Sequence, residues 1–321
     1  MKEIERNHLY IGGVLLLYYI IWNAIEYFLG GYFNPSVQTV SNIAIFSVIV
    51  IFSHMVTHLF PCVHYAALRK LEINKIFRLN SINKKQLLLT LGIFITFNIM
   101  ASVIIVTQDA ILKNFGISFK MNDYIIADNL VACLVLVAII GILIPIAEEL
   151  FYRGLLLRGM EGINPYFAIT LSAIYFAIYH NNPYRLITLF FFAVLFGLVT
   201  HYTRSIIPGI IMHILNNTVF VVYSYFQGKE VATSQYNGIS ELELLFFNSY
   251  WVLLLLFTIS AILCVLLFNK LRGISDYPIK GDSPCLSLEE KKRGLLFIIP
   301  PFVISVALFI LRASGVINMT Y

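Results

Sequence analysis

Long apolar runs separated by short polar segments make up most of the chain. Several runs exceed 18 residues, which is long enough for a helix to cross a bilayer. We therefore predict an all-α, polytopic helical membrane protein with about nine transmembrane helices. The fourth run continues through a short charged stretch, so its helix is expected to extend to about Leu157. The predicted spans are 9–29, 37–60, 87–108, 126–147, 165–181, 184–202, 205–226, 245–268 and 294–312.

The composition supports this interpretation. Of the 321 residues, 59% are hydrophobic and 12% are charged, whereas about a quarter of the residues of a soluble domain are charged. The net charge of +5 does not indicate a nucleic acid partner, because the positive side chains cluster in a few loops. The expected surroundings are the lipid bilayer. Cys62, Cys133, Cys264 and Cys285 form no C-x-x-C pair, so no disulfide framework or cysteine zinc site is indicated.

The charged loops predict an orientation. Loops 61–86 and 269–293 are rich in lysine and arginine, so the positive-inside rule places both in the cytoplasm. The N-terminus then lies in the cytoplasm, the 227–244 loop lies outside, and the protein spans the cell (plasma) membrane many times. Loop 61–86 contains Arg69, Lys70, Lys75, Arg78, Lys84 and Lys85 against one acid, Glu72. Loop 269–293 contains Lys270, Arg272, Lys280, Lys291, Lys292 and Arg293. The 227–244 loop contains Glu230, Glu241 and Glu243.

Charged residues interrupt the apolar segment 145–157, PIAEELFYRGLLL. An ionisable side chain costs about 2.5–3.5 kcal/mol at the centre of a membrane helix, so such residues usually face the bundle interior. Glu149 and Arg153 are four apart and share a helical face, so Arg153 can neutralise Glu149. Glu148 points about 100° away and lacks that partner, as a desolvated general base would. The alternative is that both acids sit at the cytoplasmic end of the span.

Two histidines and an asparagine follow in the central third of the chain. His180 stands one turn after Phe176 and just before an Asn-Asn-Pro sequence that ends the helix. A histidine at this position is either a helix cap or a catalytic group. His213 and Asn217 are four apart inside an otherwise apolar span, where either catalysis or hydrogen bonding between helices explains them.

His54 and His58 are also four apart, near the end of the second span. A metal pair is one interpretation of this spacing. Because no carboxylate or cysteine lies near them in the sequence, we interpret them as interfacial histidines.

The central positions read as E-E-x(3)-R, F-x(3)-H and H-x(3)-N on three of four successive predicted helices. This ordered set resembles the CAAX-processing and bacteriocin-processing (CPBP, or Abi) family of intramembrane proteases. The resemblance covers about residues 130–225. It implies a protease core in 126–226, which the predicted apolar spans flank with N-terminal transmembrane helices in 1–125 and C-terminal transmembrane helices in 227–321.

The resemblance implies an intramembrane endopeptidase that acts on membrane-associated proteins or peptides. Peptide hydrolysis needs a base for water and donors for the oxyanion, which these residue types supply. In the family's pattern, Glu148 activates water and His180 assists it. His213 and Asn217 bind the oxyanion. Glu149 completes the catalytic set. Arg153 and Phe176 support it structurally. A divalent metal such as zinc stays open, with Glu148, His180 and His213 as ligands, although the H-E-x-x-H motif is missing and no metal is required.

Other functions remain open at this point. A non-catalytic scaffold that regulates a partner enzyme is expected to lose the glutamate pair or a histidine, and this chain keeps them. A transporter would show inverted repeats and broken helices, which are not visible.

The Ile, Lys and Asn bias is typical of a low-GC bacterium, in which a prenylated substrate is not expected.

The predicted topology creates one difficulty. Straight helices would put Glu148 in the cytoplasmic half of the bundle and His180 near its outer end. The two residues can meet if the turn after His180 lies below the membrane surface, or if the fourth helix slides until Glu148 is near mid-bilayer.

Overall fold

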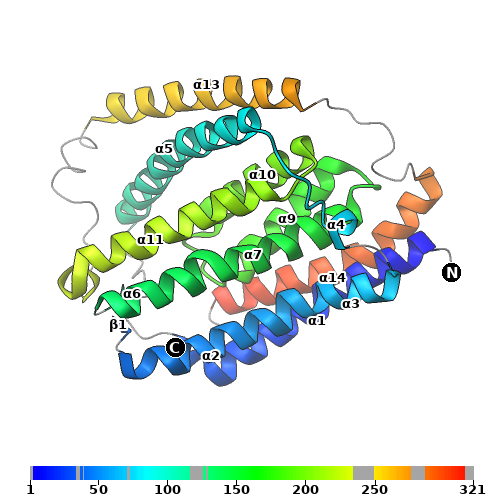
Figure 1. Ribbon diagram of the computed structural model, residues 1–321, viewed down its shortest axis with the longest axis horizontal. Helices are drawn as coiled ribbons and strands as arrows, with labels where there is room; N and C mark the ends of the chain where they lie inside the picture. Colours follow the sequence, from blue (N-terminus) through cyan, green and yellow to red (C-terminus); the bar gives the residue numbers. More distant parts are fainter. Residues whose placement is uncertain are drawn as a thin grey trace.

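The computed structural model describes residues 3–33, 37–38, 40–70, 73–115, 126–127, 129–233, 249–275 and 286–314. These residues form a bundle of long helices packed lengthwise (Figure 1). Among them, eight helices are long and apolar enough to cross a membrane, judged by length and composition. A ninth apolar helix, α9 (Pro165–Tyr179), has 15 residues. The prediction of an all-α, polytopic membrane protein is confirmed.

The remaining elements follow the predicted runs closely. Two long rods contain π-helical turns: α2, η1 and α3 form one, and α6, η2, α7, η3 and α8 form the other. The bounds are α1 (Glu3–Phe33), β1 (Val37–Gln38), α2 (Val40–His54), η1 (Met55–Leu59), α3 (Phe60–Arg69), α4 (Ile73–Ile76), α5 (Lys84–Asn114), β2 (Ile126–Ala127), α6 (Leu130–Leu136), η2 (Val137–Leu143), α7 (Ile144–Glu149), η3 (Leu150–Leu157), α8 (Arg158–Met160), α10 (Leu186–Thr203), α11 (Ile207–Thr233), α13 (Tyr250–Ile274) and α14 (Leu288–Ala313).

Two of the predicted span starts need correction. Residues 37–38 and 126–127 do not belong to helices but pair with each other as short parallel strands, Val37 opposite Ile126. Cys285, Glu72, Lys280, Glu241 and Glu243 lie outside the described residues, as do the side chains of Lys75 and Glu230.

The rod from α6 to α8 lies inside the bundle. Figure 1 shows α5 and α13 side by side along one edge, and α1, α2 and α14 along the opposite edge, with α6, α7, α9, α10 and α11 between them. Of the most apolar window in this rod, 44% is buried inside the protein, against 17% in α13. The charged stretch of this rod therefore faces other helices rather than the surroundings of the bundle.

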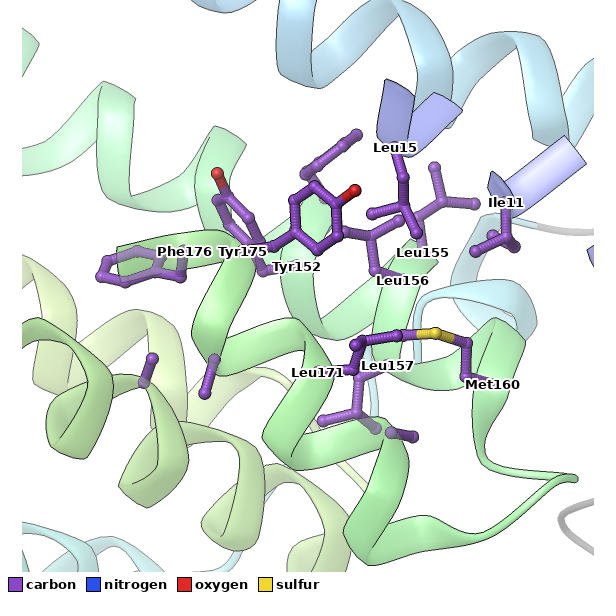
Figure 2. Close-up of a cluster of buried hydrophobic side chains, with 14 of the residues drawn as sticks. Ile11, Leu15, Tyr152, Leu155, Leu156, Leu157, Met160, Leu171, Tyr175 and Phe176 are labelled. Atoms are coloured by element: carbon purple, nitrogen blue, oxygen red, sulfur yellow. The ribbon is translucent and has the colours of Figure 1, made fainter. Parts of the chain in front are cut away.

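A continuous apolar core fixes the end of this rod. Side chains from α1, η3, α8 and α9 meet there (Figure 2). Gly154 in η3 lets Phe77 lie directly against the helix, because a Cβ at this position would stand 2.6 Å from the Phe77 ring. Because Ile11 and Leu15 of α1 belong to the same core, the N-terminal helix is packed against the central helices. The core includes Ile11, Leu15, Leu155, Leu156, Leu157, Met160 and Leu171.

Helix lengths bring the end of α9 back to the level of Glu148. Met160 lies twelve positions after Glu148, about 18 Å along a helix at about 1.5 Å per residue. The chain then reverses, and α9 spans about 22 Å with its 15 residues. Asn164 caps the start of α9 by accepting a hydrogen bond from Phe167 N, and Asn181 ends it in the left-handed conformation at φ 51°.

Candidate active site

The two adjacent glutamates at the end of α7 are both buried but face different partners. Glu148 is 4% exposed and Glu149 is 0% exposed. Arg153 Nη1 donates to Glu149 Oε1 at 2.8 Å, so the pair expected from the four-residue spacing forms. Glu148 instead faces imidazole rings of other helices. The adjacent carboxylates are therefore in distinct environments.

The buried guanidinium of Arg153 is fully surrounded. Its Nη2 donates to the Ala193 carbonyl at 3.1 Å, which anchors the rod to α10. Its central carbon also lies 5.0 Å from the Phe176 ring centre and 5.4 Å from that of Phe196. Cation–π contacts of this kind strengthen when water is excluded. Arg153 thus offers Glu149 a counter-charge that is fixed in position.

His213 of α11 lies between the two carboxylates. Its Nδ1 is 2.9 Å from Glu149 Oε1, and its Nε2 is 3.5 Å from Glu148 Oε2. Because a carboxylate only accepts hydrogen bonds when ionised, Nδ1 carries a proton that it donates to Glu149. The bridge joins α11 to the glutamate pair and places Nε2 at Glu148.

His180 occupies the end of α9, as its interpretation as a helix cap expects. It is the residue that closes α9, and its Nδ1 lies 2.8 Å from the Phe176 carbonyl of the last turn. It also interacts electrostatically with Glu148, which it reaches because α9 returns to that level of the bundle. The Phe176 ring lies 4.8 Å from the ring of His180 and 5.7 Å from that of His213.

Asn217 follows one turn after His213 on α11 and is partly buried. Its Nδ2 donates to the Ile140 carbonyl of η2 at 3.2 Å. An amide nitrogen has two N–H groups, so one remains for another acceptor. The structure thus places Glu148, Glu149, His180 and His213 in mutual contact or electrostatic range, with Asn217 one turn away.

The interpretation of His54 and His58 as interfacial histidines without a nearby carboxylate is wrong. His54 Nε2 lies 3.7 Å from Glu148 Oε1, and the His58 ring is fully buried. The four-residue spacing does put the rings of His54 and His58 side by side. The carboxylate that faces His54 is that of Glu148, about 90 residues later in the chain. Sequence proximity could not reveal this pairing.

Another buried carboxylate, Glu161, was not recognised from the sequence. Arg78 binds it through two hydrogen bonds of 3.0 and 2.6 Å, and His201 Nδ1 lies 2.7 Å from it. Burial raises the pKa of Glu161, but the hydrogen bond from His201 and the charge of Arg78 outweigh burial and lower that pKa to about 2. Arg78, counted from the sequence among the charges of loop 61–86, is therefore a buried structural cation. The sequence signal for this cluster was Arg158, which stands three positions before Glu161 and lies 3.3 Å from it.

The described residues contain no group of three or more histidines, cysteines, aspartates or glutamates that could hold a metal ion. Within the conditional ligand set of Glu148, His180 and His213, the Nδ1 of His213 faces Glu149 and its Nε2 faces Glu148.

The central part of the chain matches a known family. Residues 130–219 match the family model described as Type II CAAX prenyl endopeptidase Rce1-like. The resemblance to CPBP intramembrane proteases is confirmed over this segment, and the match supports an intramembrane endopeptidase of the CAAX type. The matched segment includes all the site residues expected from the sequence and excludes His54. No curated protein and no solved structure matched the chain.

Proposed function

We propose, from the place of residues 130–219 in the CPBP family of intramembrane endopeptidases, that this protein cleaves peptide bonds with Glu148 as the base that activates water. The observation that carries this role is the unequal surroundings of the two glutamates. Glu149 is held by the permanent charge of Arg153. Glu148 faces two titratable imidazoles, those of His54 and His213, at ion-pair distance, so it can accept and release a proton.

In this reaction, a water molecule loses a proton to the Glu148 carboxylate, and its oxygen attacks the carbonyl carbon of the scissile peptide. The carbonyl oxygen gains negative charge, which N–H donors must stabilise. We assign these donors to His213 Nε2, when it is protonated, and to the second N–H of Asn217. The intermediate then loses its amine, which takes the proton from Glu148. His180 assists this transfer from the end of α9.

Glu149, Arg153 and Phe176 support these groups. Glu149 orients His213 by accepting from its Nδ1, and Arg153 donates to Glu149 and supplies its counter-charge. Phe176 packs against both histidines and the guanidinium. Catalytic groups need partners that lock their rotamers, which this set provides. The core assigned to residues 126–226 would carry this machinery, between transmembrane helices 1–125 and 227–321. No step uses a metal.

The expected substrate is a membrane protein or a membrane-associated peptide, because the site lies among helices that cross the bilayer. We further propose a bacterial plasma membrane with the N-terminus in the cytoplasm, from the residue bias and the loop charges. A peptide without a prenyl group is then the expected class of substrate.

The test compares purified wild type with Glu148→Gln on a broad panel of membrane-embedded peptides. We expect cleavage to fall by about 10²–10⁴-fold or more, because a general base is lost, while the melting temperature is retained. Glu289→Gln is the matched control, since this glutamate side chain is 74% exposed at the start of α14. A chelator should leave wild-type activity unchanged.

Turnover by Glu148→Gln within twofold of wild type would reject Glu148 as the base. Absence of cleavage by the wild type across the panel would reject the peptidase and favour a scaffold that regulates a partner enzyme.

A further inference from the structure

Glu148 is held between two imidazole rings from two different helices. Its Oε2 faces His213 Nε2 at 3.5 Å, and its Oε1 faces His54 Nε2 at 3.7 Å. His213 lies inside the segment that matches the protease family. His54 ends α2, outside that segment. The second contact is therefore supplied by the N-terminal helices.

The hydrogen bonding of His54 determines what its Nε2 can do. Nδ1 lies 2.9 Å from the Val50 carbonyl, and a carbonyl oxygen can only accept, so Nδ1 carries a proton. Nε2 then meets Glu148 either as the second N–H of an imidazolium or as a bare lone pair. Two acceptors facing each other in a buried site are unfavourable, and a proton held between this imidazole and Glu148 removes that repulsion.

The charges around Glu148 favour such a proton. Two carboxylates, Glu148 and Glu149, meet one permanent cation, Arg153, which leaves one negative charge inside the bundle. A buried uncompensated charge is costly, so a histidine must balance it. His213 is shared between both carboxylates, whereas His54 faces Glu148 alone. The other titratable groups that act on Glu148 are His58, Tyr152, Tyr179 and His180.

The ring of His54 is held firmly in place. It stacks on the His58 ring with 4.9 Å between centres and 8° between planes. His58 is fully buried, with Tyr18 and Thr57 in hydrogen-bond range and the Tyr179 ring edge-on to it. The π-helical turn η1 begins directly after His54, a feature that is frequent at functional sites. His54 is thus ordered before any substrate arrives.

We propose that His54 is a positioning residue of the active site, which orients the Glu148 carboxylate through its Nε2 and holds the proton that balances its charge. This role rests on the proposed function of Glu148. The N-terminal helices therefore complete the site, and the segment that matches the family does not contain all of it.

The test uses two substitutions that separate the two ring nitrogens. His54→Asn keeps a donor near the Nδ1 position and loses Nε2, whereas His54→Gln places a donor near the Nε2 position. We expect kcat to fall about 10- to 100-fold in His54→Asn with KM within twofold, because a misplaced catalytic group slows the chemical step. His54→Gln should recover part of kcat. His64→Asn is the matched control, since His64 lies on the same rod and contacts Tyr10.

A second measurement does not depend on turnover. A hydrophobic carbodiimide reacts with protonated buried carboxyl groups, and mass spectrometry locates the modified residue. We expect faster modification of Glu148 in His54→Asn than in wild type or His64→Asn, because a carboxyl that has lost its counter-charge takes up a proton.

The outcomes separate this role from the proposed function. If Glu148→Gln stays active, the proposed function is rejected. If Glu148→Gln is inactive while His54→Asn keeps wild-type kcat and wild-type carbodiimide reactivity, only the role of His54 is overturned. A rise in KM alone, or a loss of folding in His54→Asn that His54→Gln shares, also overturns it.

Discussion

Arg153 Nη1 lies 2.8 Å from Glu149 Oε1, and both side chains are at most 1% exposed. An ion pair with this little access to water has lost the hydration of both charges. Besides binding each other, Arg153 donates to the Ala193 carbonyl and Glu149 faces the Nδ1 of His213. Removal of one member leaves the other charge buried without compensation.

We predict that Arg153→Ala lowers the free energy of unfolding by about 3–5 kcal/mol, the usual cost of breaking a buried pair from one side. Thermal unfolding in detergent measures this loss. The control is Arg293→Ala, which removes an Arg–Glu pair of the same four-residue spacing from α14. Its side chains are 51% and 74% exposed, so the expected loss is about 0–1 kcal/mol. Equal melting temperatures for the two variants would show that the Arg153 pair is solvated.

Asn217 provides a test of the oxyanion assignment. Asn217→Ala should lower kcat by about 10²–10³-fold, the usual effect of removing one oxyanion donor, with a smaller change in KM. Asn98→Ala is the control, because the Asn98 amide donates within its own helix to the Phe94 carbonyl, 2.9 Å away. Steady-state kinetics on a cleaved peptide measures both constants. A variant with unchanged kcat would remove Asn217 from the catalytic set.

The sequence predicted the helices and the Glu149–Arg153 pair but missed contacts made by distant helices. Apolar runs and the spacing of Glu149 and Arg153 are local patterns, so both could be read directly. The contact of His54 with Glu148 depends on how two rods pack, which no local spacing records. Arg78 resembled a loop charge for the same reason, since its partner Glu161 lies 83 residues later. The difficulty with His180 arose from assuming straight spans of equal depth, whereas α9 is short and returns to the level of Glu148.

The Glu161 cluster predicts a dependence of stability on acid. The pKa of Glu161 is about 2 in the folded protein, against an ordinary value of 4.5. A carboxyl whose pKa is lowered by folding contributes its full stabilisation of the folded protein above the pKa that it has in the unfolded chain. This stabilisation disappears as the pH falls toward the pKa that it has in the folded protein. The difference in unfolding free energy between wild type and Glu161→Gln should therefore be largest above about pH 4.5 and shrink toward pH 2. Chemical unfolding across this range measures it.

A difference that stays constant over the same pH range would contradict the assignment. It would mean that Glu161 does not change its protonation between the folded and unfolded states. Glu289→Gln gives the baseline, because its exposed pair should contribute little at any pH.

Two adjacent glycines in α1 test how closely the first and last described helices pack. A Cβ at Gly12 would stand 2.0 Å from the Phe297 carbonyl oxygen of α14, whereas a Cβ at Gly13 meets nothing within 4 Å. Backbone atoms cannot move aside as a flexible side chain does, so Gly12→Ala must push α14 away from α1. We predict a loss of about 1–3 kcal/mol or more for Gly12→Ala. Gly13→Ala should be neutral or stabilising by up to about 1 kcal/mol, because alanine favours helix over glycine. Thermal unfolding of the two variants side by side measures this contrast, and equal stability would show that α1 and α14 do not approach at Gly12.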